Sequence, residues 1–281
     1  MEQLLKVENL RVSYHSYAGE VQSVRGVSFE VSKGETVAVV GESGCGKSVT
    51  SKAIMGLIQC PPGEIKEGSH IYFENQDLLS FQEKQWEKYR GAECSMIFQD
   101  ALTSLNPTMN IGNQIIENIT NHKNITKLEA KKEAIRLLEL VGIPEPAARI
   151  KQYPHELSGG MRQRAALIRT LALKPDLLLL DEPFSALDHQ TRLMVCDDIS
   201  SILRKNGKTA ILVTHDLSEA ISFADRIIVL TPRPGRIRTV LYLSFPDDCN
   251  SPLKRRNCPE FSHYFNTLWK ELIKDDQTAG I

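Results

Sequence analysis

The fold is decided by one glycine-rich stretch, Gly41-Glu42-Ser43-Gly44-Cys45-Gly46-Lys47-Ser48. It matches the phosphate-binding pattern G-x-x-x-x-G-K-[ST] at every fixed position. Residues 35–40 before it are a short apolar run that predicts a buried strand, and residues 47–58 predict a helix that is stopped by Pro61-Pro62-Gly63. A strand, a glycine loop and a helix open a phosphate-binding α/β unit. A chance glycine turn would lack these flanking elements.

This phosphate loop, residues 41–48, suits a nucleotide for physical reasons. Its glycines allow the backbone to curl so that N–H groups face the anion, and the next helix directs its positive N-terminal end at the same place. We expect Lys47 to reach the β- and γ-phosphates of ATP and Ser48 to bind Mg²⁺. Val49, the next residue along, is expected in the same nucleotide site.

A pair of acids follows a run of leucines. Residues 177–180 are all leucine and predict a buried strand, after which come Asp181 and Glu182. Such residues emerge at the carboxyl edge of the sheet, where open α/β folds bind ligands. Asp181 fits the role of holding Mg²⁺, directly or through water, and Glu182 fits a general base or a residue that orients the attacking water. Alone, the pair could be two solvated acids; beside the phosphate loop, it indicates hydrolysis.

The bulk composition is that of a soluble globular protein. The chain has 281 residues, 41% hydrophobic and 25% charged, with a formal net charge of −1. This balance implies no broad attraction to nucleic acid. No apolar run approaches the roughly 18–20 residues that cross a bilayer. The opening sequence MEQLLKVENL does not have the pattern of a signal peptide, so we expect a cytoplasmic chain.

The six cysteines are scattered, and none forms a CxxC pair. In a chain without a leader this pattern predicts reduced thiols. Cys249 and Cys258 suggest a metal site, but two ligands without nearby histidine pairs are a weak signal for one.

Strands and helices alternate along most of the chain. Alternating apolar residues predict strands at 5–12 and 22–31. Between about residues 100 and 157, apolar residues fall at helical spacing. Further expected elements are helices at 158–173 and 189–205, strands at 177–180, 209–213 and 226–230, and a last strand and a helix near 261–273. Strands that alternate with helices imply a mainly parallel sheet.

A second glycine-containing motif is typical of one protein family: Leu157-Ser158-Gly159-Gly160-Met161-Arg162-Gln163-Arg164. It resembles the LSGGQ signature of ABC ATPases, with Met161 in place of glutamine. The order of motifs resembles these enzymes throughout residues 4–232: the phosphate loop, Gln99, the signature, the acidic pair, Ser185-Ala186-Leu187-Asp188 and His215. The resemblance implies the α/β class, with a P-loop NTPase core built on a mainly parallel sheet with helices, an antiparallel β subdomain and a helical signature subdomain.

The resemblance also divides the chain. It implies an ABC ATPase domain over residues 1–232, with the helical subdomain inserted at about 100–157, and a C-terminal strand and helix over 233–281. The change to Met161 should be tolerated, because a serine hydroxyl and glycine N–H groups supply the phosphate contacts.

Further site residues follow from the resemblance alone. Tyr14 would stack on adenine, with Tyr17 as the alternative. Gln99 would sense Mg²⁺ and the γ-phosphate at the contact with a membrane subunit. His215 would contact the γ-phosphate as the switch histidine.

A second group would act across a dimer. Ser158, Gly159 and Gly160 would bind the γ-phosphate of ATP held by the opposite subunit, and Asp188 would belong to the D-loop at that interface. Two ATP molecules would hold two subunits together until hydrolysis releases them. The implied partners are transmembrane permease subunits, a second identical or different ATPase subunit and, indirectly, a substrate-binding protein, with no nucleic acid. The implied place is the cytoplasmic face of the inner (plasma) membrane.

The two halves of the chain resemble different importers. Residues 41–48, 96–100, 103–107 and 153–156, with Met161, resemble the ATPases of dipeptide, oligopeptide and nickel importers. Residues 181–188, 214–220, 228–230 and 233–237, with a tail helix that carries Trp269, resemble those of nitrate, sulfonate and taurine importers. We expect the second cargo class, with the first as the alternative. A non-transport ABC ATPase, an exporter subunit and an inactive regulatory subunit are weaker alternatives, the last because Glu182 and His215 are intact.

Overall fold

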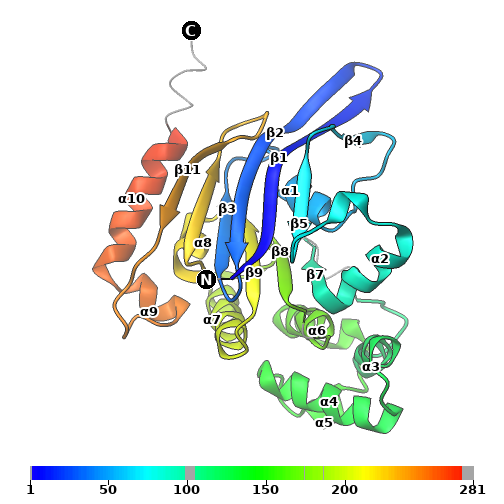
Figure 1. Cartoon of the computed structure of the whole chain (residues 1–281). Coiled ribbons are helices and arrows are strands. Elements are labelled where there is room, and N and C mark those ends of the chain that lie inside the picture. Colours follow the sequence, from blue (N-terminus) through cyan, green and yellow to red (C-terminus); the bar gives the residue numbers. More distant parts are fainter. Residues whose placement is uncertain (1, 99–104, 174, 186, 274–281) are drawn as a thin grey trace.

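The computed structural model describes residues 2–98, 105–173, 175–185 and 187–273. Its centre is a six-stranded sheet in the order β11-β10-β3-β9-β8-β7. Neighbouring strands are parallel from β10 to β7, and β11 joins β10 antiparallel, which confirms the expected mainly parallel sheet (Figure 1). The strands are β3 (Thr36–Val40), β7 (Cys94–Ile97), β8 (Leu177–Asp181), β9 (Thr209–Thr214), β10 (Arg226–Leu230) and β11 (Ile237–Tyr242).

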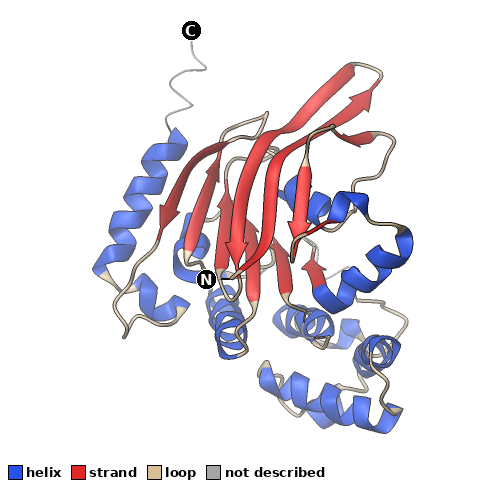
Figure 2. Cartoon of the chain, viewed as in Figure 1, coloured by secondary structure: helices blue, strands red, loops and turns tan. Residues whose placement is uncertain are grey.

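A second, antiparallel sheet lies beside the first and includes a long hairpin, β1 (Gln3–Ser16) and β2 (Gly19–Ser32). Figure 2 shows this hairpin extending beyond the other strands. The strands predicted at 5–12 and 22–31 are confirmed and are longer than expected. The sheet is completed by β4 (Gly63–Ile65), β5 (His70–Phe73) and β6 (Gln76–Asp77), which the sequence patterns did not indicate.

The parallel sheet separates two hydrophobic cores. In β3, Val37 and Val39 face a core shared with the antiparallel sheet, whereas Ala38 and Val40 face a core filled mainly by helices. The four leucines of β8 alternate between the same two cores. Burial on both faces explains why these strands read as continuous apolar runs.

The helical face of the sheet carries α6 (Gly159–Leu171), α7 (His189–Lys205) and α8 (Leu217–Phe223). The predicted helical region contains α3 (Ile111–His122), α4 (Lys127–Leu140) and α5 (Pro146–Arg149). Thr126 caps α4 in a reciprocal box with Glu129. The remaining short helices are η1 (Leu78–Ser80), α2 (Glu83–Lys88), η2 (Tyr89–Glu93) and η3 (Pro154–Glu156).

The first helix, α1 (Lys47–Ile54), is shorter than the expected 47–58. Gly56 adopts a φ of +63°. The N–H groups of Gly56 and Leu57 donate to the carbonyls of Ala53 and Lys52, a glycine-based helix stop. The helix therefore ends at a left-handed glycine, ahead of the prolines that we expected to stop it.

The C-terminal segment packs on the helical face of the parallel sheet. After β11 come α9 (Pro252–Arg256), which was not expected, and α10 (Pro259–Ile273). Leu268 of α10 is fully buried, and the buried Arg255 of α9 donates to the carbonyl oxygen of Ala224 at 2.5 Å. Cys249 and Cys258 form a disulfide, so the prediction that every cysteine is reduced was wrong for this pair. The spacing of two cysteines in a chain does not reveal that the backbone brings them together.

Within the residues described, no helix combines the length and apolar character needed to span a membrane.

Candidate active site

Sheet register brings three motifs to one edge. Val40 pairs with Thr214, and Val213 pairs with Asp181, so β3, β9 and β8 end side by side. The phosphate loop follows β3, Glu182 follows β8 and His215 follows β9. The carboxyl edge of the sheet therefore collects residues that lie far apart in the sequence, as expected for an open α/β fold.

Lys47 is held inside the curl of the phosphate loop. Its buried ammonium donates to the carbonyl oxygens of Gly41 at 2.7 Å and Glu42 at 2.8 Å. Gly46 has a φ of +95°, and a Cβ there would lie 2.6 Å from the carbonyl oxygen of Ser23 in β2. This position therefore requires glycine both for its backbone conformation and for its contact.

A loop after β10 supports the phosphate loop from outside. A Cβ on Gly235 would lie 2.0 Å from the carbonyl oxygen of Cys45, and the N–H of Gly235 donates to Ser23 at 3.1 Å. Arg233 donates from Nε to the carbonyl oxygen of Gly44 at 3.3 Å. Our sequence analysis did not include this loop in the site. The feature that could have indicated it is a glycine-containing turn directly after a buried strand.

Ser48 and Asp181 meet at the base of the site. The Ser48 hydroxyl donates to Oδ1 of Asp181 at 2.7 Å. Burial raises the pKa of Asp181, and the hydrogen bond from Ser48 opposes that shift by favouring the carboxylate. A hydroxyl and a carboxylate are oxygen ligands of the kind that Mg²⁺ prefers. The pair fits the predicted magnesium site.

Glu182 and His215 face each other across the end of the sheet. His215 Nδ1 lies 3.3 Å from Oε1 of Glu182. Glu182 has a φ of +45°, and its N–H donates to the carbonyl oxygen of Val213 at 2.8 Å. A left-handed conformation in a residue other than glycine costs energy, and residues under such strain cluster at active sites and switch regions. The His215 side chain is 63% exposed, whereas that of Glu182 is 15% exposed.

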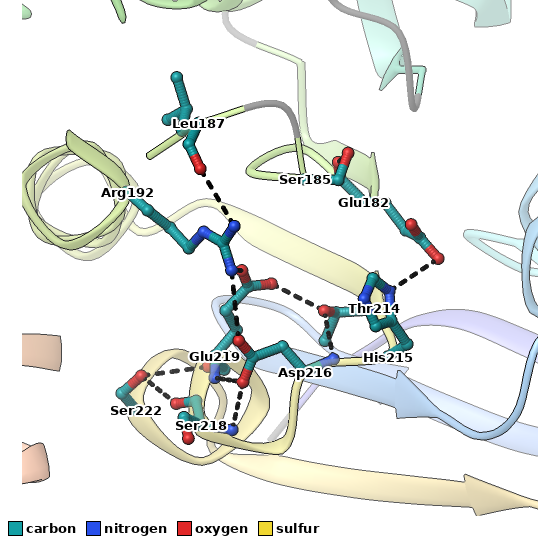
Figure 3. A network of polar contacts seen from close by, with 10 residues as sticks. All are labelled: Glu182, Ser185, Leu187, Arg192, Thr214, His215, Asp216, Ser218, Glu219 and Ser222. Atoms are coloured by element: carbon teal, nitrogen blue, oxygen red, sulfur yellow. Dashed lines mark hydrogen bonds and ion pairs between the residues drawn. The ribbon is translucent and has the colours of Figure 1, made fainter. Parts of the chain in front are cut away.

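A polar network surrounds the switch segment, residues 214–219 (Figure 3). The Thr214 hydroxyl donates to Oε2 of Glu219 at 2.7 Å and accepts the N–H of Asp216 at 3.0 Å. Asp216 caps α8 by accepting the N–H groups of Ser218 and Glu219. Burial raises the pKa of Glu219, whose carboxylate faces the guanidinium of Arg192. Sequence reasoning did not select Arg192, Glu219 or Thr214.

The signature residues begin a different helix. Ser158 caps α6, and its hydroxyl oxygen accepts the N–H of Met161 at 3.3 Å. A Cβ on Gly159 would meet open space, whereas one on Gly160 would lie 2.7 Å from Cγ2 of Thr191. Across the described part of the chain, no hydrogen bond or ion pair joins Ser158, Gly159 or Gly160 to the phosphate loop.

Asp188 is an exposed cap of α7. Its Oδ1 accepts the N–H of Thr191 at 3.0 Å, and this backbone hydrogen bond is the main reason that the pKa of Asp188 is lowered. The residue thus has a structural role in its own chain, while its exposure leaves it accessible to another subunit.

The two aromatic candidates for adenine, Tyr14 and Tyr17, lie in different surroundings. Tyr14 pairs with Val21 in the hairpin and packs partly on the core, close to where β2 contacts the phosphate loop at Gly46. Tyr17 lies at the hairpin tip and is fully exposed. Gln99 lies outside the described residues.

The comparisons with known proteins agree on one family. The profile described as "ABC transporter" matches residues 24–185. A dipeptide transport ATP-binding protein of Bacillus subtilis is 49% identical over 230 residues, which are 82% of this chain and 68% of the relative. An oligopeptide transport ATP-binding protein of the same organism is 51% identical over 227 residues, 81% of this chain and 63% of the relative. The chain thus spans about two thirds of the length of these two relatives.

Among solved structures, a dimeric ATP-binding cassette in a post-hydrolysis state, bound to ADP and Pi, superposes with a TM-score of 0.75 at 25% identity. The match covers 86% of this chain and 100% of that one.

Proposed function

We propose that this chain, which belongs to the ABC transporter family of ATPases, binds ATP on its phosphate loop and hydrolyses it with Glu182 as base. The observation that carries the proposal is the Glu182–His215 pair at 3.3 Å, beside the Ser48–Asp181 pair. Asp181 ends β8, Glu182 and His215 directly follow β8 and β9, and Ser48 lies in α1, after the loop that follows β3. The four residues therefore gather where three neighbouring strands end. Their hydroxyl, carboxylate and imidazole groups are those needed to bind a metal, activate water and contact a phosphate.

The reaction is the attack of water on the γ-phosphorus, with cleavage of its bond to the bridging oxygen of ADP. Glu182 takes a proton from that water or orients it for attack. Lys47 and the backbone N–H groups of residues 41–48 neutralise the phosphate oxygens. His215 would contact the γ-phosphate, and its Nδ1 lies 3.3 Å from Oε1 of Glu182.

Ser48 and Asp181 would hold Mg²⁺, Ser48 directly and Asp181 directly or through water. When bound, the ion neutralises charge on the β- and γ-phosphates. Gln99 is proposed as a further contact of this ion.

We propose that the complete site forms between two subunits. Ser158 and Asp188 are exposed, and among the described residues no hydrogen bond or ion pair joins the signature to the phosphate loop of its own chain. A second subunit would therefore supply Ser158, Gly159, Gly160 and Asp188 to each ATP. A dimeric assembly in a similar structure, bound to ADP and Pi, supports this arrangement.

For cargo, the comparisons favour a peptide importer, the alternative of our sequence analysis, over the nitrate, sulfonate or taurine importers that we expected. The first relatives found are named for dipeptide and oligopeptide transport. The C-terminal motifs that suggested anions form the switch segment and the support of the phosphate loop, which serve ATP chemistry whatever the cargo. We propose that the chain works at the cytoplasmic face of the membrane with permease subunits.

A tagged copy purified from membranes of its host, with co-purifying proteins identified by mass spectrometry, tests the transport role. Two hydrophobic subunits and a peptide-binding protein are the expected partners. An anion-binding protein would overturn the peptide assignment, and soluble nucleic-acid-associated proteins would overturn transport. The ATPase assignment is tested separately, by release of phosphate from Mg²⁺-ATP by the purified chain.

A further inference from the structure

We propose that Arg192 is a positioning residue for hydrolysis, because its guanidinium ties the backbone just before Asp188 to the switch segment that carries His215. The inference rests on the proposed ATPase function and adds to it a connection within one chain. It links a residue proposed to face the opposite subunit with a residue proposed to contact the γ-phosphate.

One side chain makes all the contacts (Figure 3). Nη2 of Arg192 donates to the carbonyl oxygen of Leu187 at 3.1 Å. Nη1 lies 3.4 Å from Oδ2 of Asp216 and 3.5 Å from Oε1 of Glu219. The two nitrogens of one planar group therefore face in two directions, one toward the D-loop and one toward the switch segment.

The acidic partners of Arg192 have fixed positions. The second oxygen of Glu219 accepts the Thr214 hydroxyl, and the second oxygen of Asp216 caps α8. Thr214 and Asp216 are the two neighbours of His215, and a further hydrogen bond of 3.0 Å joins them. The backbone on both sides of His215 is thus anchored to partners of the same guanidinium. A displacement of Leu187 would therefore shift the hydrogen-bonded residues on both sides of His215, Thr214 and Asp216.

Arginine has the chemistry that this role requires. Its donors lie in a rigid fork, whereas lysine offers a single flexible point charge. Glu219 is 3% exposed, and a buried carboxylate needs a charged or hydrogen-bonding partner. The neighbouring Thr191 lies beside the signature, because a Cβ on Gly160 would be 2.7 Å from its Cγ2. The first turn of α7 therefore meets the D-loop, the switch segment and the signature of its own chain.

The test is steady-state ATP hydrolysis by the purified full chain carrying Arg192→Lys. Lysine retains a positive charge beside Glu219 but cannot reproduce the fork. We expect kcat to fall about 10- to 100-fold, the size of effect that follows a displacement of about 1 Å in an active site. KM for ATP should stay within about threefold, because the phosphate loop is untouched. The matched control is Arg204→Lys, at the other end of α7, where the arginine pairs with Asp225. It should keep wild-type kcat.

A second measurement separates positioning from general stability. Arg192 and His215 are connected through Thr214, Asp216 and Glu219, so in a His215→Ala background the change Arg192→Lys should lower kcat far less than in the wild type. An equal fold-loss in both backgrounds, or a wild-type kcat for Arg192→Lys, would overturn the inference.

Two further outcomes are distinguishable. If Arg192→Lys does not fold, Glu219→Gln replaces it, with the same expected loss of kcat at near-constant KM; an unchanged kcat would reject the network. If the wild-type chain itself fails to hydrolyse Mg²⁺-ATP, the proposed function fails, and this inference fails with it. Hydrolysis by the wild type and by Arg192→Lys at equal rates removes this inference alone.

Discussion

Ser48 and Asp181 are 133 residues apart in the chain, yet the hydroxyl of one donates to the carboxylate of the other at 2.7 Å. The bond connects the first residues of α1 to the last residue of β8. It shows that the two halves of the proposed magnesium site are already oriented toward each other by the fold.

Replacing Ser48 by alanine removes one proposed Mg²⁺ ligand and the hydrogen bond that favours the Asp181 carboxylate. We expect the Mg²⁺ concentration for half-maximal ATPase activity to rise about 10- to 100-fold, with little change in folding. A Mg²⁺ titration of phosphate release measures this. Ser262→Ala, on the exposed side of α10, is the control. An unchanged titration would remove Ser48 from the metal site.

Lys47→Ala should weaken ATP binding about 10- to 100-fold, because hydrogen bonds to a charged group contribute about 1.5–3 kcal/mol. Fluorescent-nucleotide titration measures the Kd. Lys131→Ala, an exposed lysine on α4, should bind like the wild type. Normal affinity in Lys47→Ala would contradict the assignment of the phosphate loop.

Glu182→Gln should retain ATP affinity and lose about 10²- to 10⁴-fold in kcat, since the amide cannot accept the proton of the attacking water. With ATP bound but not hydrolysed, the dimer should accumulate, which size-exclusion chromatography with and without ATP would detect. Glu139→Gln on the exposed face of α4 is the matched control. Steady-state turnover at the wild-type rate in Glu182→Gln would remove this residue from the role of base.

Gly235→Ala tests the outer support of the phosphate loop. The new Cβ would lie 2.0 Å from the Cys45 carbonyl oxygen, so the loop must shift. We expect a loss of about 1–3 kcal/mol in the free energy of unfolding, as overpacking usually costs, together with weaker ATP binding. Gly19→Ala, at the open hairpin tip, adds backbone strain with nothing within 4 Å of its Cβ. Equal ATP affinity in the two variants would show that Gly235 does not support the loop.

Thiol alkylation at pH 8 tests the cysteine environments. Cys60 is exposed and should react quickly, whereas burial raises the pKa of Cys94 to about 12 and keeps it a neutral, unreactive thiol. Peptides containing Cys249 and Cys258 should be cross-linked until a reductant is added. Peptide mapping by mass spectrometry reads both results. Rapid labelling of Cys249 without reductant would contradict the disulfide.

The sequence predicted the helices and strands in which apolar residues recur at regular spacing or whose ends are marked by clear loop residues. The bounds of α7 and β10 are those expected, because apolar residues recur at regular spacing and loops flank them. By contrast, β4 has three residues and β6 has two, too few to show a period. The end of α1 depends on the left-handed conformation of Gly56. Two prolines downstream are equally plausible helix stops, so the sequence alone does not show which residue ends the helix.

The sequence predicted those site residues whose residue type and position in a motif indicate a single chemical role. Lys47, Ser48, Asp181, Glu182 and His215 lie at the carboxyl edge of one sheet, as their places after predicted strands implied. Arg192 and Gly235 were missed because their roles depend on tertiary contacts: an arginine early in a helix is usually solvent-exposed, and a glycine after a strand usually only turns the chain. The disulfide was missed for the same reason.

The contact between Gly235 and Cys45 limits how far this chain can be shortened. The family match ends at residue 185, and we placed the domain boundary at residue 232. A fragment cut at either point would lack Gly235, which packs on the outside of the phosphate loop, although the longer fragment would contain the phosphate loop, the signature, the acidic pair and His215. Because β11 also pairs with β10 as far as Tyr242, we expect that a fragment must extend past that residue to keep both the strand pairing and the support of the phosphate loop.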